Sequence, residues 1–220
     1  MLDAFLATIE TTAEVVMHRS LADITRLARA DSEIYATFYQ RTAAGMTISG
    51  GDRWDELRAM ADTALFGERN KSEIRFAALS LDGIGSPHYG ECAIALRIPM
   101  IAHRTSLIEE NSAIFMRRHD YRRPAGCLAS WARRGTLAAA KLGDALQPAT
   151  TPAEFLNLVL APGATSDDGR YIEAHVGGSL TVRSFREVTI RKWKTKPRRV
   201  DIKALEEKLA KYNVAFAKPN

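Results

Sequence analysis

The stretch IRFAALSLDGIGSPHYGECAIALRI, residues 74–98, decides the fold class of the chain. It holds two short apolar runs, at 74–81 and 91–98, each about as long as a buried strand. Gly, Ser and Pro in the residues between the runs are typical of a loop. We therefore expect two buried neighbouring strands here, and a sheet in the middle of the chain.

The part of the chain before these strands is predicted to be mainly helical. Apolar residues at 3–30 recur at helical spacing, although VVMHR at 15–19 also fits a short strand that leads into a helix capped by Ser20. The sequence leaves these two alternatives open. Further helices are predicted at 33–44 and at 53–67.

The part of the chain after these strands alternates between helix and strand. The elements that we expect are a strand that becomes a helix at 101–116, helices at 125–146 and 151–160, strands at 171–176 and 186–193, and a C-terminal helix at 201–212. The sequence shows no internal repeat and no clear linker. We therefore expect one domain over 1–220 with an α+β fold.

This domain is expected to have three portions. A mainly helical N-terminal portion covers 1–70, and an α+β core with a small mixed or antiparallel central sheet covers 71–196. A C-terminal docking helix and tail cover 197–220. The helix of this tail has a narrow apolar stripe, which needs a partner surface within the fold.

The composition is that of an ordinary globular protein. Of 220 residues, 46% are hydrophobic and 26% are charged. No window approaches the roughly 18 apolar residues of a membrane-spanning helix, and the N-terminal residues lack the pattern of a secretory signal peptide. We expect a cytoplasmic protein, and a secreted effector stays open. Cys92 and Cys127 lie far apart, so we expect core residues in a reducing compartment.

Common catalytic motifs are absent from the sequence. It contains no GxxxxGK[ST], no GxGxxG that opens a helix, no CxxC, no HExxH and no GxSxG. The histidines share no spacing, so we expect no metal site built from them. The clearest candidate is YIEAHVGGSL at 171–180, because strand alternation places Tyr171, Glu173 and His175 on one face. Such a face either points to solvent or presents a catalytic carboxylate to a cleft.

Three segments together resemble the ADP-ribosyltransferase family. They are VMHRSLADI at 16–24, FAALSLDGIGSPHYGECAIALR at 76–97 and RYIEAHVGGSL at 170–180, which cover less than half of the chain. In that family the first element supplies Arg or His, the second Ser or Tyr, and the third a Glu. The matching positions here are His18 or Arg19, Ser80 or Tyr89, and Glu173.

The resemblance implies an enzyme that removes nicotinamide from its co-substrate NAD and passes ADP-ribose to an acceptor. Glu173 would be the catalytic carboxylate, Arg19 or Arg104 would bind the pyrophosphate, and Tyr89 would stack on the nicotinamide ring. The sequence departs from the family at Tyr171, where the family's toxins often carry Gln or Glu. It also separates the first two elements by a helical insertion. Many such transferases are toxins, effectors or defence proteins.

The charge of the chain bears on its macromolecular partner. The formal net charge is +5, and basic residues gather at 117–123, 132–134 and 191–199. Such runs are either solvated surface or contacts for phosphates. If they contact phosphates, these runs favour a nucleic acid over a protein as the acceptor of ADP-ribose.

Two alternative functions stay open at this point. One is a metal-dependent nuclease in which Glu173 converges on Mg²⁺ with Glu91 and with Glu109 or Glu110. The other is a noncatalytic nucleic-acid-binding or interaction protein that uses only the basic runs and the C-terminal amphipathic helix.

Overall fold

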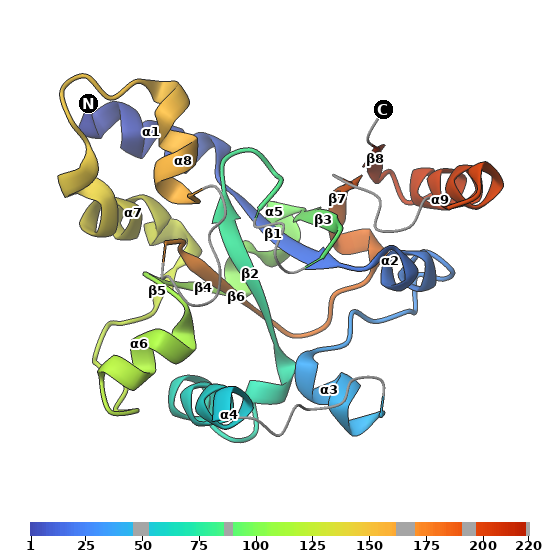
Figure 1. The fold of residues 1–220 in the computed structure, drawn as a ribbon, viewed down its shortest axis with the longest axis horizontal. Coiled ribbons are helices and arrows are strands. Elements are labelled where there is room, and N and C mark those ends of the chain that lie inside the picture. Colours follow the sequence, from blue (N-terminus) through green and yellow to red (C-terminus); the bar gives the residue numbers. More distant parts are fainter. Residues whose placement is uncertain (46–52, 86–89, 162–169, 191–196, 219–220) are drawn as a thin grey trace.

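A computed structural model describes residues 1–45, 53–85, 90–161, 170–190 and 197–218 of the chain. Within these residues the strands form one mixed sheet in the order β5-β4-β6-β2-β1-β3-β7-β8 (Figure 1). All neighbouring strands are antiparallel except the parallel pair β7 and β8. The strands are β1 (Glu14–Arg19), β2 (Ile74–Ser80), β3 (Cys92–Leu96), β4 (Thr105–Ile108), β5 (Ala129–Ser130), β6 (Glu173–Gly177), β7 (Phe185–Ile190) and β8 (Ala215–Ala217).

Helices pack around this sheet, so the predicted α+β class is confirmed. They are α1 (Leu2–Thr12), α2 (Leu21–Leu27), α3 (Phe38–Ala43), α4 (Arg53–Phe66), α5 (Ile98–Ile101), α6 (Ser112–Arg118), α7 (Arg134–Leu142), α8 (Phe155–Val159) and α9 (Arg199–Ala210). None of the helices in the described ranges is long and apolar enough to cross a membrane.

The strand β1 lies at the centre of the sheet. It pairs with β2 on one edge and with β3 on the other. The two apolar runs at 74–81 and 91–98 are therefore strands, but β1 separates them, and the prediction that they are neighbours is wrong. Of the two alternatives for 15–19, the structure has the strand, which is followed by α2. The Ser20 side chain caps α2 by accepting a hydrogen bond from the Asp23 N–H.

One face of the sheet carries the main core. Val15 and Met17 of β1 and Ala174 and Val176 of β6 belong to it. The helices α1, α7 and α8 lie together beside this face (Figure 1), and α1 contributes Phe5, whose ring meets Phe155 of α8 edge to face at 5.1 Å. Burial of these aromatic and aliphatic side chains supplies the main driving force for folding.

The opposite face carries a smaller cluster over one end of the sheet. Leu65 of α4 packs there with Ile108 of β4 and with Phe115 and Met116 of α6. Alternation along β1 and β6 turns His18 and Glu173 to this second face, away from the main core. The polar residues of the candidate site therefore share the face on which α4 and α6 pack.

Several helices begin later than the sequence predicts. The helix predicted at 33–44 begins at Phe38, because Thr37 and Gln40 form a capping box and the Tyr35 N–H bonds to the Leu180 carbonyl. The helix predicted at 125–146 begins at Arg134, because the preceding Ala129–Ser130 pairs with β4 as β5.

The predicted C-terminal helix is present as α9. It begins before Asp201, whose carboxylate pairs with the Arg198 guanidinium at 2.8 Å. The side chains of Leu205 and Leu209 join the main core, as the apolar stripe predicts. The short strand β8 after α9 has no counterpart among the predicted elements.

Candidate functional site

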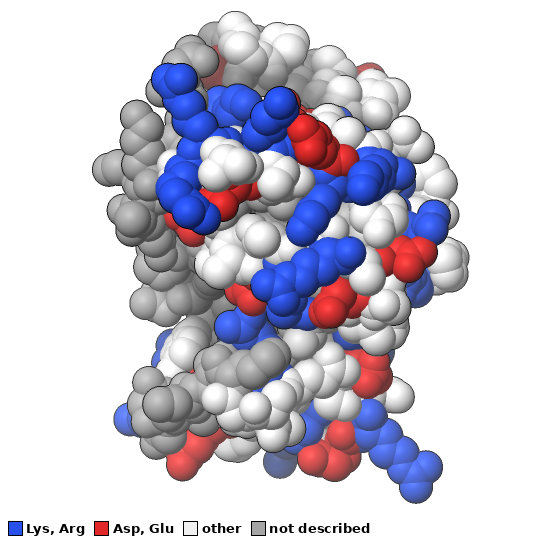
Figure 2. Space-filling view, turned by 90° about the vertical axis from the view of Figure 1, so that its right-hand side faces the viewer, with Lys and Arg blue, Asp and Glu red and all other residues white. Residues whose placement is uncertain are grey.

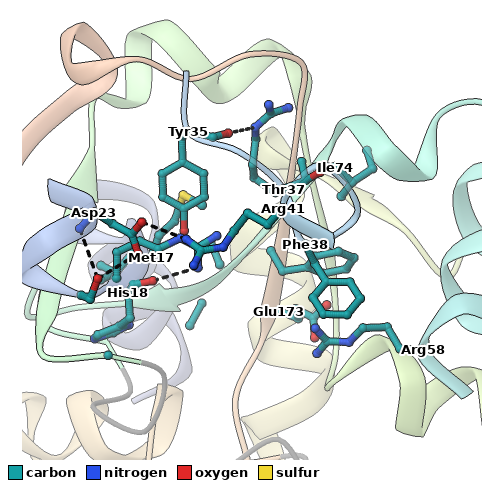
Figure 3. Close-up of a pocket in the computed structure, with 18 of the residues that line it drawn as sticks. Met17, His18, Asp23, Tyr35, Thr37, Phe38, Arg41, Arg58, Ile74 and Glu173 are labelled. Carbon is teal, nitrogen blue, oxygen red and sulfur yellow. Dashed lines mark hydrogen bonds and ion pairs between the residues drawn. The ribbon is translucent and has the colours of Figure 1, made fainter. Parts of the chain in front are cut away.

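A cavity of about 440 Å³ lies on the second face of the sheet. Residues of β1, β2 and β6 form its floor, and residues of α3, α4 and the segment before α3 line its sides (Figure 3). Its volume is within the range of small-molecule and cofactor sites. We call it the pocket.

The carboxylate of Glu173 lines the pocket from β6 and is held by four hydrogen bonds. Its Oε1 accepts from the Ser112 hydroxyl and from His175 Nε2, both at 2.9 Å. Its Oε2 accepts from the Ser112 N–H at 3.2 Å and from the Tyr171 hydroxyl at 3.3 Å. The side chain is fixed before any ligand arrives.

The environment of Glu173 keeps it ionised. The residue is only 3% exposed. Burial by itself raises the pKa of such a carboxyl, but the hydrogen bond and charge of His175, with help from Arg58 and Ser112, hold the pKa of Glu173 below its ordinary value. The pocket therefore contains a preorganised negative charge with little water around it.

The end of β1 places His18 and Arg19 at the same pocket. The Nε2 of His18 lies 2.8 Å from the Ile84 carbonyl oxygen. The Arg19 guanidinium lies 4.2 Å from the centre of the Tyr35 ring and donates to the carbonyls of His18 and Ala36 at 3.2 and 3.3 Å. The stack on Tyr35 holds the plane of the guanidinium in one orientation.

Three further arginines line the pocket. Arg75 is buried and donates to the backbone carbonyls of Tyr35, Glu73 and Gly178, so it joins segments of the fold. Arg41 pairs with Asp23 at 2.9 Å.

Arg58 of α4 differs from the other arginines of the pocket. Its guanidinium lies 5.6 Å from the centre of the Phe76 ring and extends toward Glu173 (Figure 3). Among the described residues it forms no hydrogen bond or ion pair. Its charge is therefore available to an anionic ligand.

The structure brings together some of the residues predicted from sequence. Glu173, His18 and Arg19 line one cavity, although β1 and β6 lie at opposite ends of the chain. Glu173 and His175 are both buried, so the alternative of a strand face that points to open solvent is wrong.

Other predicted residues lie away from the pocket or outside the described ranges. Ser80 does not line it, because the register places Ser80 opposite Glu14, at the far end of β1 from Arg19. Arg104 donates to the carbonyls of Gly177 and Ser179 at 2.6 and 3.0 Å and so holds the turn after β6. Tyr89 falls within 86–89, outside the residues that the structure describes.

The carboxylates of the nuclease alternative do not converge. Glu91 accepts a hydrogen bond from the Leu21 N–H at 2.9 Å, while Glu109 and Glu110 both pair with Arg118. In the described parts of the chain, no group of three or more His, Cys, Asp or Glu side chains is placed to hold a metal ion.

Parts of the basic runs serve the fold itself. Arg134 donates to the Ile9 and Trp131 carbonyls at 3.3 and 3.0 Å, and Arg123 donates to the Leu65 carbonyl at 2.9 Å. Residues 191–196 lie outside the described ranges.

The molecular surface mixes charges of both signs. On the face shown in Figure 2, Lys and Arg side chains are spread over a wide area with Asp and Glu among them. Ion pairs such as Arg183 with Asp31 and Arg26 with Glu33, both at 2.6 Å, join the two signs. This arrangement is that of a solvated surface more than of a continuous track for phosphates.

Several polar residues around Glu173 are not among those predicted from the sequence. Ser112 and Arg58 are placed only by the packing of α6 and α4 on the sheet, which no local pattern reveals. Asp62 of α4 is fully buried and accepts a hydrogen bond from the Tyr39 hydroxyl at 2.7 Å. Its position beside Ala61 and close to Leu65, on the apolar side of α4, is a signal for a buried acid.

Comparisons with known proteins assign no family to this arrangement. No model of a known protein family matches the chain, and no curated protein gives a significant match. The function therefore has to be argued from the residues of the pocket.

Proposed function

We propose that the pocket binds NAD, cleaves the bond between nicotinamide and ribose, and transfers ADP-ribose to a macromolecular acceptor. The observation that carries this proposal is that Glu173 from β6 and His18 and Arg19 from β1 line one cavity. These positions match the acidic and the basic elements of the ADP-ribosyltransferase pattern.

The state of Glu173 suits this reaction. As nicotinamide leaves, positive charge develops on the ribose, and a fixed carboxylate beside it stabilises the transition state more than the ground state. Glu173 is held by four hydrogen bonds, with its pKa below the ordinary value. No reorganisation of water is then needed during the reaction.

The cations of the pocket suit the pyrophosphate of the same ligand. The guanidinium of Arg19 is oriented by Tyr35, and that of Arg58 has no hydrogen-bonding partner among the described residues. A planar fork of N–H donors binds phosphate oxygens in pairs. The aromatic rings of Phe38 and Phe76 also line the pocket and offer apolar surface to a planar base.

The acceptor that we propose is a nucleic acid, with a protein as the alternative. The support is the net charge of +5 and the basic runs, in which Arg117, Arg118 and Arg133 are exposed. Labelling decides between the two acceptors, because the product is sensitive either to nuclease or to protease.

The reaction is tested with NAD that carries a label on the adenylate and with cell extract as the source of acceptor. Wild-type protein is expected to release nicotinamide and to label a macromolecule. Glu173→Gln keeps the size of the side chain but loses its charge, so the rate is expected to fall about a hundredfold or more. NAD binding, measured by calorimetry, is expected to persist in this variant.

Glu206→Gln is the matched control for this experiment. Glu206 lies exposed on α9 and pairs with Lys218, outside the pocket. The control variant is expected to act like wild type. A wild-type protein that neither binds NAD nor releases nicotinamide contradicts the proposal, and so does a Glu173→Gln variant with full activity.

A further inference from the structure

His175 is a buried polar residue with one hydrogen-bonding partner. It is 1% exposed and does not line the pocket, so it is not placed to touch a ligand there. Its Nε2 lies 2.9 Å from Glu173 Oε1, and its Nδ1 has no partner among the described residues. Burying an imidazole is costly unless its hydrogen bond serves the structure or the site.

The direction of the hydrogen bond follows from the state of Glu173. An ionised carboxylate only accepts hydrogen bonds, so the Nε2 of His175 carries the hydrogen and donates it. The imidazole is packed edge to face against Phe66, at 4.9 Å and 76°, and against Phe76, at 5.4 Å and 82°. These contacts fix the plane of the ring, and therefore the direction of the donor.

The other donors to Glu173 come from separate elements. Ser112 begins α6 and donates with both its hydroxyl and its N–H. Tyr171 donates from two residues before β6 and accepts from the Asn111 amide at 3.0 Å. Only His175 shares the strand of Glu173, two residues further along the same face.

Other charged groups face this cluster from α4. Arg58 lowers the pKa of Glu173 by its positive charge. Asp62 is close enough for its pKa to respond to the charges of both Glu173 and His175. The charges of Glu173, His175 and Asp62 therefore act on one another within this cluster.

We propose that His175 is a positioning residue for Glu173, which holds the catalytic carboxylate in the orientation and the charged state that cleavage of NAD requires. The inference rests on the proposed function for its catalytic consequence. Its structural part, the control of Glu173 by His175, stands independently. The geometry that supports it is a donor of fixed direction at 2.9 Å from the carboxylate of a residue that lines the pocket.

Two variants that differ by one methylene test this role. In His175→Gln the side-chain amide is long enough to place a donor near the position of Nε2, whereas in His175→Asn the amide is too short to reach Glu173. Both residues are neutral amides, so burial of a polar group is matched. Circular dichroism and thermal unfolding of the full chain show whether each variant is folded.

We expect the Asn variant to lose roughly ten- to hundredfold in kcat for nicotinamide release, with little change in KM for NAD. Loss of the donor also raises the pKa of Glu173, so the acid limb of the kcat profile is expected to move to higher pH. The Gln variant keeps the donor but lacks the charge of His175, so its kcat and its acid limb are expected to lie clearly closer to wild type than those of the Asn variant. Equal profiles for wild type and the Asn variant overturn the proposal.

A measurement without NAD separates failure of this inference from failure of the proposed function. Carbon-13 NMR follows the titration of the Glu173 carboxyl in the full chain, with Glu173→Gln used to assign the signal. A larger rise of the pKa in the Asn variant than in the Gln variant supports positioning even if NAD is not the substrate. An unchanged pKa rejects it. Should both variants fail to fold, Ser112→Ala removes one other donor to Glu173, and the same rise in pKa is expected.

Discussion

At the scale of single residues, the role of Arg19 depends on its shape as well as on its charge. The guanidinium lies 4.2 Å from the centre of the Tyr35 ring, and Arg19 lines the pocket. Lysine keeps the charge but has neither the planar fork nor the stacking surface. Arg19→Lys is therefore expected to raise KM for NAD about tenfold or more, with a smaller effect on kcat.

Calorimetry with NAD checks this prediction directly. Arg29→Lys is the matched control, because Arg29 is exposed and does not line the pocket. Equal affinities in the two variants would show that Arg19 does not contact the ligand.

At the scale of elements, the loop after β2 packs closely against β1 beside the pocket. Gly85 has a φ of +64°, and a Cβ added there would lie 2.6 Å from His18 Cε1 and 2.9 Å from Val16 Cγ1. Gly67 has a φ of +79°, but a Cβ added there meets nothing within 4 Å. At both positions a residue with a side chain would have a strained backbone. Of the two, only Gly85 would also bring the added Cβ into a steric clash.

Gly85→Ala is therefore expected to lower the free energy of unfolding by about 2–3 kcal/mol, and Gly67→Ala by about 1 kcal/mol. Urea denaturation of both variants measures the difference. Because the clash displaces His18, the Gly85 variant is also expected to bind NAD more weakly. Identical losses of stability in the two variants would mean that the loop at Gly85 shifts without cost and removes the clash.

The elements also show what local patterns predict and what they do not. The apolar runs of β2 and β3 and the helix α4 are visible in the sequence because length and periodicity define them. β1 is not visible in this way, because VVMHR fits both a strand and a helix. Only the pairing of β1 with neighbours on both edges selects the strand. β5 and β8, of two and three residues, are strands only through their partners.

The residues of the candidate site likewise include some that local patterns predict and some that they do not. Glu173 is predictable, because alternation along β6 turns an acid and an imidazole to one face. Ser80 fails to reach the pocket because its place depends on the register with β1, which no local pattern contains. Ser112 and Arg58 come from helices whose packing on the sheet is decided by the whole core.

At the scale of the whole molecule, Asp62 makes stability depend on pH. Burial raises the pKa of Asp62 from 3.8 to about 6, so the folded protein binds this proton more tightly than the unfolded chain does. The stabilisation is fully present below about pH 4 and is lost as the pH rises through about 6. At 1.36 kcal/mol for each unit, the loss is at most about 3 kcal/mol.

Asp62→Asn removes this titration. Relative to wild type, the variant is expected to gain stability as the pH rises from about 4 to about 7, by up to about 3 kcal/mol. Urea denaturation across this range measures the difference, with the exposed Asp144→Asn as control. Parallel curves for wild type and Asp62→Asn would contradict the assignment of a raised pKa to Asp62.

The central place of β1 has a consequence for the order in which the molecule becomes active during synthesis. β1 is synthesised before both of its partners, so its two hydrogen-bonded edges stay open until β2 and β3 follow. The carboxylate of Glu173 follows much later, on β6, together with the histidine that orients it. Under our proposal, a nascent chain that ends before β6 carries the arginines of the pocket without the carboxylate, so it is expected to be unable to cleave NAD.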